Sequence, residues 1–179
     1  MNLKYETDTN KPEFEFMTVH DNLDVLTTGQ KEIWDHFYAG KEKIGPLDKD
    51  DIDPIKIAKY LSCVWMADLY LDDEGKLKDY KYRLIGTRLT PIYGERTGEK
   101  IISDDGPLSL KNQMPAAYYR ITNVLSLLAE TNMPVFSRSY YTERARQHLN
   151  VSGITIPVCH DSDDVNMIFG FVDLSRTVV

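Results

Sequence analysis

Apolar residues recur at steps of three and four positions in two segments, which is the spacing of one face of an α-helix. The first segment predicts a helix that begins at Thr27 or Thr28 and ends near residue 38. The second predicts the strongest helix of the chain, over residues 115–131, and Met133-Pro134 ends it. Its apolar stripe consists of Tyr118, Ile121, Leu125 and Leu128. A shorter helix is expected to start at Asp53-Pro54, with proline at its first position.

Five apolar runs have the length and composition of β-strands. The runs at 61–71 and 80–87 flank an acidic turn at 72–76 and predict an antiparallel hairpin. Three later runs cover 135–142, 149–159 and 166–174. Helical segments precede the first two strands and separate them from the last three, an order that predicts an α+β fold with an antiparallel sheet.

The predicted hairpin carries two further expectations. Its second strand alternates, with Tyr80, Tyr82 and Leu84 on one face. Asp68 and Arg83 fall on the two adjacent strands, and we expect them to form a cross-strand ion pair that fixes the register.

Composition and charge narrow the classes of function. Residues 1–24 are polar and predict a partly irregular arm, and residues 25–179 predict a single domain. The 28 acidic and 21 basic residues give a net charge of −7, which argues against wholesale binding to nucleic acid or to an anionic membrane. The apolar runs are far shorter than the ~20 residues of a membrane span. The first residues have no signal-peptide pattern, so a cytoplasmic protein is expected.

Motifs for catalysis and metal binding are missing from the sequence. There is no glycine-rich phosphate loop, and the two cysteines and four histidines lack metal-ligand spacing. We therefore expect neither a metal site nor an enzyme. His148, beside the start of a predicted strand, keeps one alternative open, a small cavity enzyme in which it acts as a base with an aspartate beside it.

Tyrosines are frequent, and most of the eleven fall on or near predicted core elements. Their apolar rings and polar tips suit ordinary packing at a core edge or, alternatively, a polar-lined cavity for a small ligand between the long helix and the sheet. Arg138 alternates with Phe136 and Tyr140 on one strand face, where its guanidinium suits a carboxylate or phosphate, or an acid of the chain. The candidate ligand-binding residues are Tyr82, Tyr93, Tyr118, Ile121, Arg138, Tyr140 and His148.

Several consecutive segments carry a resemblance to a known family. The helix start at Asp53-Pro54 leads to Val64-Trp65-Met66-Ala67-Asp68-Leu69, then to Tyr82-Arg83-Leu84-Ile85-Gly86-Thr87, and then to a short helical stretch that ends in Thr97-Gly98. In this order and spacing they resemble the single-domain PAS-like proteins of proteobacteria, over residues 25–174. The resemblance implies a five-stranded antiparallel sheet with helices packed on one face.

The same resemblance implies a non-catalytic sensory or regulatory module. Such a module binds a small molecule in an internal cavity and signals through a protein partner. No residue matches the histidine or cysteine that holds haem, flavin or a chromophore in related sensors, so the cofactor stays unknown. The helix at 27–38 is expected either to lie against the outer sheet face or to form a homodimer contact through Trp34 and Phe37. The main alternative is an adaptor that binds proteins and has a solid, ligand-free core.

Overall fold

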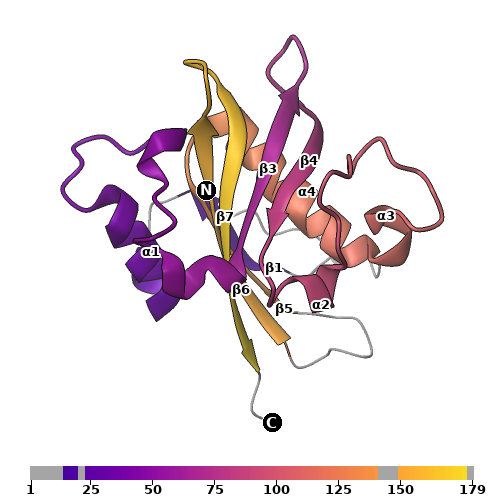
Figure 1. Ribbon diagram of the computed structural model, residues 1–179, viewed down its shortest axis with the longest axis horizontal. Coiled ribbons are helices and arrows are strands. Elements are labelled where there is room, and N and C mark those ends of the chain that lie inside the picture. Colours follow the sequence, from indigo (N-terminus) through magenta and orange to yellow (C-terminus); the bar gives the residue numbers. More distant parts are fainter. Residues whose placement is uncertain (1–13, 20–22, 141–148, 177–179) are drawn as a thin grey trace.

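The fold is α+β, as the order of predicted elements indicated. The computed structural model describes residues 14–19, 23–140 and 149–176 (Figure 1). The strands in these ranges are β1 (Phe14–Val19), β2 (Leu47–Asp48), β3 (Val64–Leu71), β4 (Leu77–Ile85), β5 (Val135–Tyr140), β6 (Leu149–Cys159) and β7 (Val165–Arg176). The α-helices are α1 (Thr28–Tyr38), α2 (Thr90–Tyr93), α3 (Leu110–Gln113) and α4 (Pro115–Thr131), and the short 3-10 helices are η1 (Leu23–Val25), η2 (Lys49–Asp51) and η3 (Ala58–Cys63).

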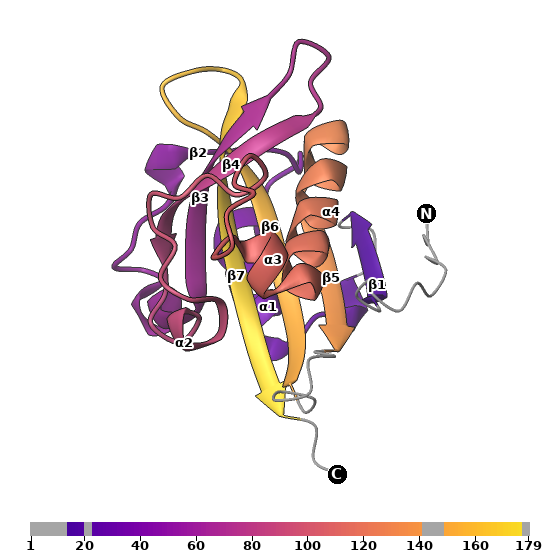
Figure 2. The same ribbon diagram turned by 90° about the vertical axis from the view of Figure 1, so that its right-hand side faces the viewer.

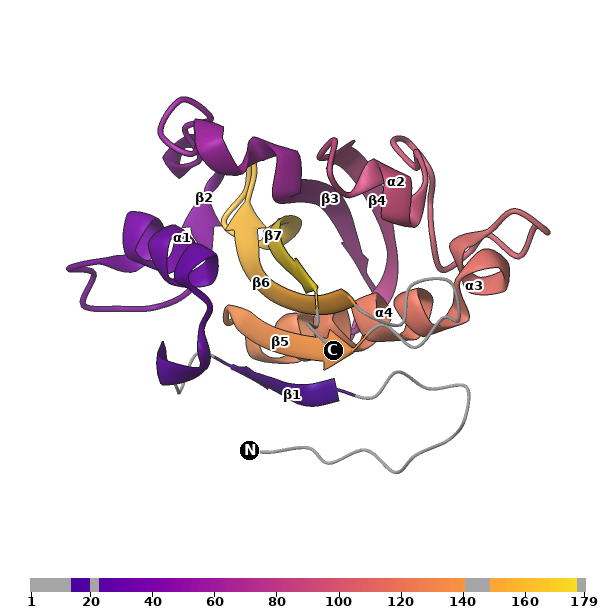
Figure 3. The ribbon, with the colours of Figure 1, turned by 90° about the horizontal axis from the view of Figure 1, so that it is seen from below.

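The strands form one sheet in the order β1-β5-β6-β7-β3-β4. Every neighbouring pair in this order is antiparallel, and the two-residue β2 adds a parallel contact to β6. The sheet curves around the side on which α4 lies (Figure 3). We call that side the inner face and the side on which α1 lies the outer face.

Successive residues of each strand point to opposite faces and build two separate hydrophobic cores. Val135 and Ile168 belong to the inner core under α4, whereas their neighbours Phe136 and Phe169 belong to the outer core under α1. Helices therefore cover both faces of the sheet. Both faces can bury a helix because large apolar residues occupy both the odd and the even positions of the central strands.

Helix α1 lies against the outer face, the first of the two placements expected for it. Thr27 caps its first turn by accepting a hydrogen bond from the backbone N–H of Gln30, and the side-chain Oε1 of Gln30 accepts one from the backbone N–H of Thr27. The rings of Trp34 and Phe136 meet edge-on at 5.2 Å between centroids, as do those of Phe37 and Phe169. Both helix side chains are buried in the chain itself, so they do not supply the homodimer contact considered as the alternative.

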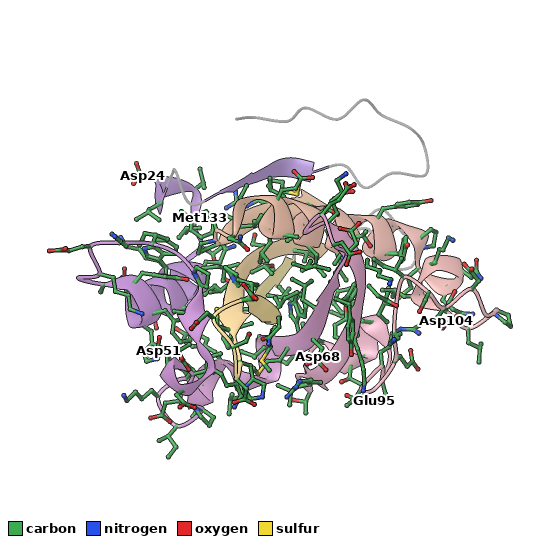
Figure 4. The ribbon with its side chains drawn as sticks, turned by 90° about the horizontal axis from the view of Figure 1, so that it is seen from above. Asp24, Asp51, Asp68, Glu95, Asp104 and Met133 are labelled. Atoms are coloured by element: carbon green, nitrogen blue, oxygen red, sulfur yellow. The ribbon has the colours of Figure 1, made fainter. Side chains whose placement is uncertain are left out.

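The hairpin of β3 and β4 forms as predicted, with two register shifts, of which the one beside Met66 changes a predicted face. Asp68 and Arg83 make the expected ion pair, and Asp68 lies on the side of β3 away from α4 (Figure 4). The register shifts between Met66 and Ala67, which pair with Leu84 and Tyr82. A bulge of this kind moves the following residues to the opposite face. Leu84 is therefore exposed on the outer side rather than buried beside Tyr82.

Two predicted segments differ from the structure. Residues 14–19, expected in an irregular arm, form β1 on β5. Residues 54–57 form turns instead of a helix, and η3 then occupies the expected start of the next strand. Gly86 packs against this segment so closely that a Cβ would come within 2.5 Å of the Ser62 carbonyl oxygen. The close packing holds η3 against the end of β4, and β3 begins at Val64 instead of the predicted residue 61.

The long helix and the last three strands match their predictions closely. Helix α4 covers the predicted residues 115–131 and ends at Asn132, whose φ of 51° lies in the left-handed region. Its buried residues include the predicted Tyr118, Leu125 and Leu128. Among the described helices, none combines the length and the apolar character needed to cross a bilayer.

Candidate functional site

A cavity lies between α4 and the inner face of the sheet, near α2. Figure 2 shows α4 running along the strands on this side. About 50 Å³ of the cavity is accessible to the centres of water molecules, several times the ~10–15 Å³ that one water requires. Its walls consist of Trp65, Tyr82, Ile85, Leu89, Tyr93, Arg120, Ile121, Val124, Ser137, Val151, Gly153, Thr155 and Val172. Mostly apolar and aromatic walls with a few polar groups are typical of small-molecule sites.

Aromatic rings from β3 and β4 form one wall. Trp65 pairs with Gly170 on the neighbouring strand, and its indole ring lies directly over that glycine. A Cβ at Gly170 would collide with the ring. The Trp65 and Tyr82 rings meet edge-on at 5.7 Å between centroids, and Tyr80 and Tyr82 do so at 5.6 Å. The absence of a side chain at Gly170 thus sets the position of this wall.

Arg120 brings a positive charge to the cavity from α4. The residue is 5% exposed, and its Nη2 donates a hydrogen bond to the Tyr93 hydroxyl at 2.9 Å. The guanidinium carbon also lies 5.9 Å from the centroid of the Tyr93 ring, within the range of a cation–π contact. Tyr93 therefore orients the guanidinium at the cavity wall.

Burial keeps the nearby tyrosine hydroxyls protonated. Desolvation raises the pKa of Tyr82, and the adjacent Tyr93 raises it further, whereas the charge of Arg120 acts in the opposite direction. The net pKa lies above the usual value, so Tyr82 presents a neutral hydroxyl to the cavity at neutral pH. Such a group donates and accepts hydrogen bonds without adding charge.

The floor of the cavity is formed by small residues of β5 and β6. Ser137 and Thr155 are both buried, and Gly153, which pairs with Ser137 across the strands, has no side chain to fill the space. On the outer side, the Gly153 carbonyl accepts a hydrogen bond from Nε2 of Gln30 at 2.7 Å. A hydrogen bond thus connects the floor of the cavity directly to the first turn of α1.

Three of the seven sequence-predicted site residues line this cavity together: Tyr82, Tyr93 and Ile121. Tyr118 is buried in the same core but is not part of the cavity wall, and its ring packs edge-on against Tyr119 at 5.4 Å. The side chain of Tyr140 and all of His148 lie outside the described residues.

Arg138 does not line the cavity, contrary to its predicted role as a ligand-binding residue. Strand alternation places Ser137 on the inner face and Arg138 on the outer one. Its Nη2 donates to the Val25 carbonyl at 2.8 Å and its Nε to the Ser152 hydroxyl at 3.3 Å. Arg138 therefore ties η1 to the sheet.

Several cavity residues were missed by sequence reasoning, and one of them had a detectable signal. Arg120 stands three residues after Ala117 and four before Val124, so it shares a face of α4 with these small and apolar residues, next to the predicted stripe. A charged residue on such a face indicates a buried polar site. Trp65, Ser137 and Thr155 carried no comparable signal, because it takes the sheet order to bring β3, β5 and β6 around one cavity.

Metal chemistry finds no support in the part of the chain that the structure describes. Within it, no three His, Cys, Asp or Glu residues are grouped so that they could hold a metal ion. Comparison with known proteins adds no identification. No protein-family model, curated protein or solved structure matches the chain significantly.

Proposed function

We propose that this protein is a PAS-like sensory module that binds a small molecule in the cavity under α4 and passes the change to a protein partner. The observation that carries the proposal is the cavity itself, which combines aromatic walls, small polar residues and the buried Arg120. A core built for stability alone is packed to the density of an organic crystal and leaves few voids larger than a water molecule.

The arrangement of the strands supports the PAS-like assignment. The resemblance implies two strands, a helical stretch and three strands in one antiparallel sheet. Strands β3 to β7 have this order along the chain and pair antiparallel as β4-β3-β7-β6-β5. The helical stretch between β4 and β5 ends in α4, which covers the inner face. Strands β1 and β2 and helix α1 are additions to this scheme.

The contact between Gln30 and Gly153 supports a route for the signal. Gly153 lines the cavity, and its carbonyl accepts the hydrogen bond from Gln30. The same Gln30 side chain accepts a hydrogen bond from the backbone N–H of Thr27 at 2.9 Å. A shift of β6 on ligand binding therefore acts directly on the N-terminus of α1, which reaches the surface.

The ligand-free adaptor remains the second candidate, because the enclosed space is small. A cavity with about 50 Å³ open to water centres also suits a few ordered water molecules bonded to Ser137, Thr155 and Arg120. The enzyme alternative depended on His148, which lies outside the described residues, and no observation favours it.

Thermal unfolding with a broad metabolite library separates the first two candidates. A ligand at 100-fold its Kd stabilises the folded state by about 2.7 kcal/mol, which raises Tm by several degrees. We expect at least one compound to do this in the wild-type protein and not in Ile121→Phe, whose larger ring fills the cavity. If no compound raises Tm, or if both proteins respond equally, ligand binding in this cavity is refuted and the adaptor is favoured.

Association with another protein, including a homodimer, is part of the proposal for a cytoplasmic signalling module. Exposed apolar side chains near η3 and on β4 support it: Ile55, Leu61 and Leu84. Light scattering at high micromolar concentration should give twice the 20.6 kDa of one chain. A mass of one chain at all concentrations refutes the homodimer while the ligand proposal stands.

A further inference from the structure

We propose that the ligand of this cavity is a very small uncharged molecule with one hydroxyl or amide group, an inference that rests on the proposed function. Two hydroxyls on the cavity floor carry it. Ser137 and Thr155 are 8% and 4% exposed and both line the cavity. Neither hydroxyl forms a hydrogen bond within the part of the chain that the structure describes. Because buried polar groups are nearly always paired, these two hydroxyls indicate a site that a ligand or water occupies.

The two hydroxyls lie on the same face of neighbouring strands. Ser137 of β5 pairs with Gly153 of β6, and Thr155 follows two residues later along β6, so side-chain alternation places both on the inner face. A Cβ added at Gly153 would lie 3.1 Å from Oγ of Ser137. This hydroxyl therefore lies over the glycine, and the missing side chain leaves room for the polar group of a ligand to reach the floor.

Hydroxyls on the floor favour an uncharged polar group. Each of them donates one hydrogen bond and accepts others, which matches the donors and acceptors of an alcohol or an amide. A charged group loses far more hydration on burial than neutral hydroxyls restore. Arg120 does not reverse this preference, because it is engaged within the chain: it donates to the Tyr93 hydroxyl and has a further interaction. Its positive charge also disfavours a cationic ligand.

The volume of the cavity limits the ligand to a few atoms. About 50 Å³ is open to water centres, whereas one water needs ~10–15 Å³ and a cavity that binds benzene measures about 150 Å³. Ile121 and Val124 of α4 present apolar surface to the same space, which suits a short aliphatic body. 1-Butanol and propionamide are therefore suitable probes, and n-butylammonium and propionate are their charged counterparts of nearly the same shape.

The first experiment compares these four probes by NMR titration of the full-length protein at neutral pH, with Kd taken from the amide resonances of Gly153 and Thr155. We expect each uncharged probe to bind at least roughly 10-fold more tightly than its charged counterpart. Equal or tighter binding of a charged probe overturns the assignment and leaves the proposed function standing. If none of the four binds while a library compound raises Tm, the assignment alone fails. If no compound binds at all, both proposals fail.

A longer alcohol tests the size limit. On an open apolar surface, each added methylene group raises the affinity roughly fourfold. 1-Octanol should nevertheless bind no more tightly than 1-butanol, because the enclosed space cannot take the additional methylene groups. A steady rise of affinity with chain length overturns the size limit.

The last experiment assigns the binding to the floor. Thr155→Val replaces the hydroxyl by a methyl group and should weaken 1-butanol binding roughly 2- to 12-fold, the range for one neutral hydrogen bond. Thr87→Val removes a hydroxyl from an exposed position and should leave the affinity unchanged. Removal of a buried hydroxyl that has no partner should not lower Tm, which separates lost binding from lost folding. Unchanged affinity in both Thr155→Val and Ser137→Ala overturns the role of the floor.

Discussion

The two faces of the sheet are built for different tasks. On the outer face, α1 packs aromatic rings edge-on against aromatic rings of the strands, and the contacting side chains Trp34, Phe37, Phe136 and Phe169 are at most 6% exposed. On the inner face, α4 and the strands enclose a cavity that contains hydroxyls and the guanidinium of Arg120. The comparison teaches that both faces have a buried core, but that a cavity with polar groups lies only in the inner one among the described residues that these two cores comprise.

Strand β6 belongs to both faces. Its residue Ile154 is buried in the outer core, while the adjacent Gly153 lines the cavity. The two tasks are therefore separated by side-chain alternation rather than by distance. The backbone between them carries the hydrogen bond from Gln30.

The largest expected effect is the loss of an outer ring. Phe169→Ala should destabilise the protein by about 3–5 kcal/mol, the usual cost of a large buried truncation. Ile121→Ala on the inner face should cost less, about 1–2 kcal/mol, because the half-buried Ile121 borders an existing void. Urea unfolding measures both. An inner substitution as costly as the outer one would break the division between the faces.

The second-largest expected effect is that of an added methyl group at Gly170. Gly170→Ala forces the Trp65 indole away from its strand neighbour and should cost about 1–3 kcal/mol, the range for overpacking. The displaced indole should also narrow the cavity and weaken ligand binding. Gly45→Ala is the matched control, since nothing lies within 4 Å of its added Cβ. Equal stability of the two variants would show that Trp65 does not rest on Gly170.

Removal of the Gln30 side chain tests the link between the faces. Gln30→Ala loses the capping box of α1 and the hydrogen bond to the Gly153 carbonyl, and should cost about 1–3 kcal/mol. Gln113→Ala loses an exposed hydrogen bond to the Pro107 carbonyl and should change stability little. Ligand binding in the Gln30 variant should persist while amide exchange at the start of α1 no longer responds to ligand. A response identical to wild type would refute the proposed route.

A smaller effect, with a pH dependence, is expected at Asp79, a buried residue of β4. Burial alone would raise its pKa, but hydrogen bonds from the Ser103 hydroxyl and from three backbone N–H groups together lower it. The ionised form thus stabilises the folded state above the unfolded pKa of ~3.9, and this contribution is lost as pH falls through the folded pKa.

Asp79→Asn keeps one acceptor oxygen and should cost about 1–2 kcal/mol at pH 7. Stability measured again at pH 3 should show a smaller difference between variant and wild type. A difference that grows toward acid would contradict the sign of the pKa shift. Asp104→Asn provides the control, because this half-buried loop carboxylate accepts a local hydrogen bond from the backbone N–H of Gly106.

Sequence periodicity was sufficient for the elements that bury one regular stripe. Helix α4 and strands β5 to β7 follow their patterns because the 3.6- or 2-residue repeat holds over most of their length, and the shift in the β6–β7 pairing falls only at the end of β6. The bulge at Met66 interrupts the repeat, so the prediction that Leu84 shares a face with Tyr82 was wrong. The side of the sheet on which Arg138 lies was not predictable. Alternation divides the residues of a strand between two faces but does not tell which face borders the cavity.

The two tryptophans of the chain allow the most direct test of the central claim, that a ligand enters the cavity under α4. Trp65 lines the cavity, whereas Trp34 belongs to α1 and is buried against the other face of the sheet. In nitrogen–proton NMR spectra, saturating 1-butanol or propionamide should shift the indole N–H resonance of Trp65 more than that of Trp34. An unchanged Trp65 resonance, or a larger shift at Trp34, would contradict the account.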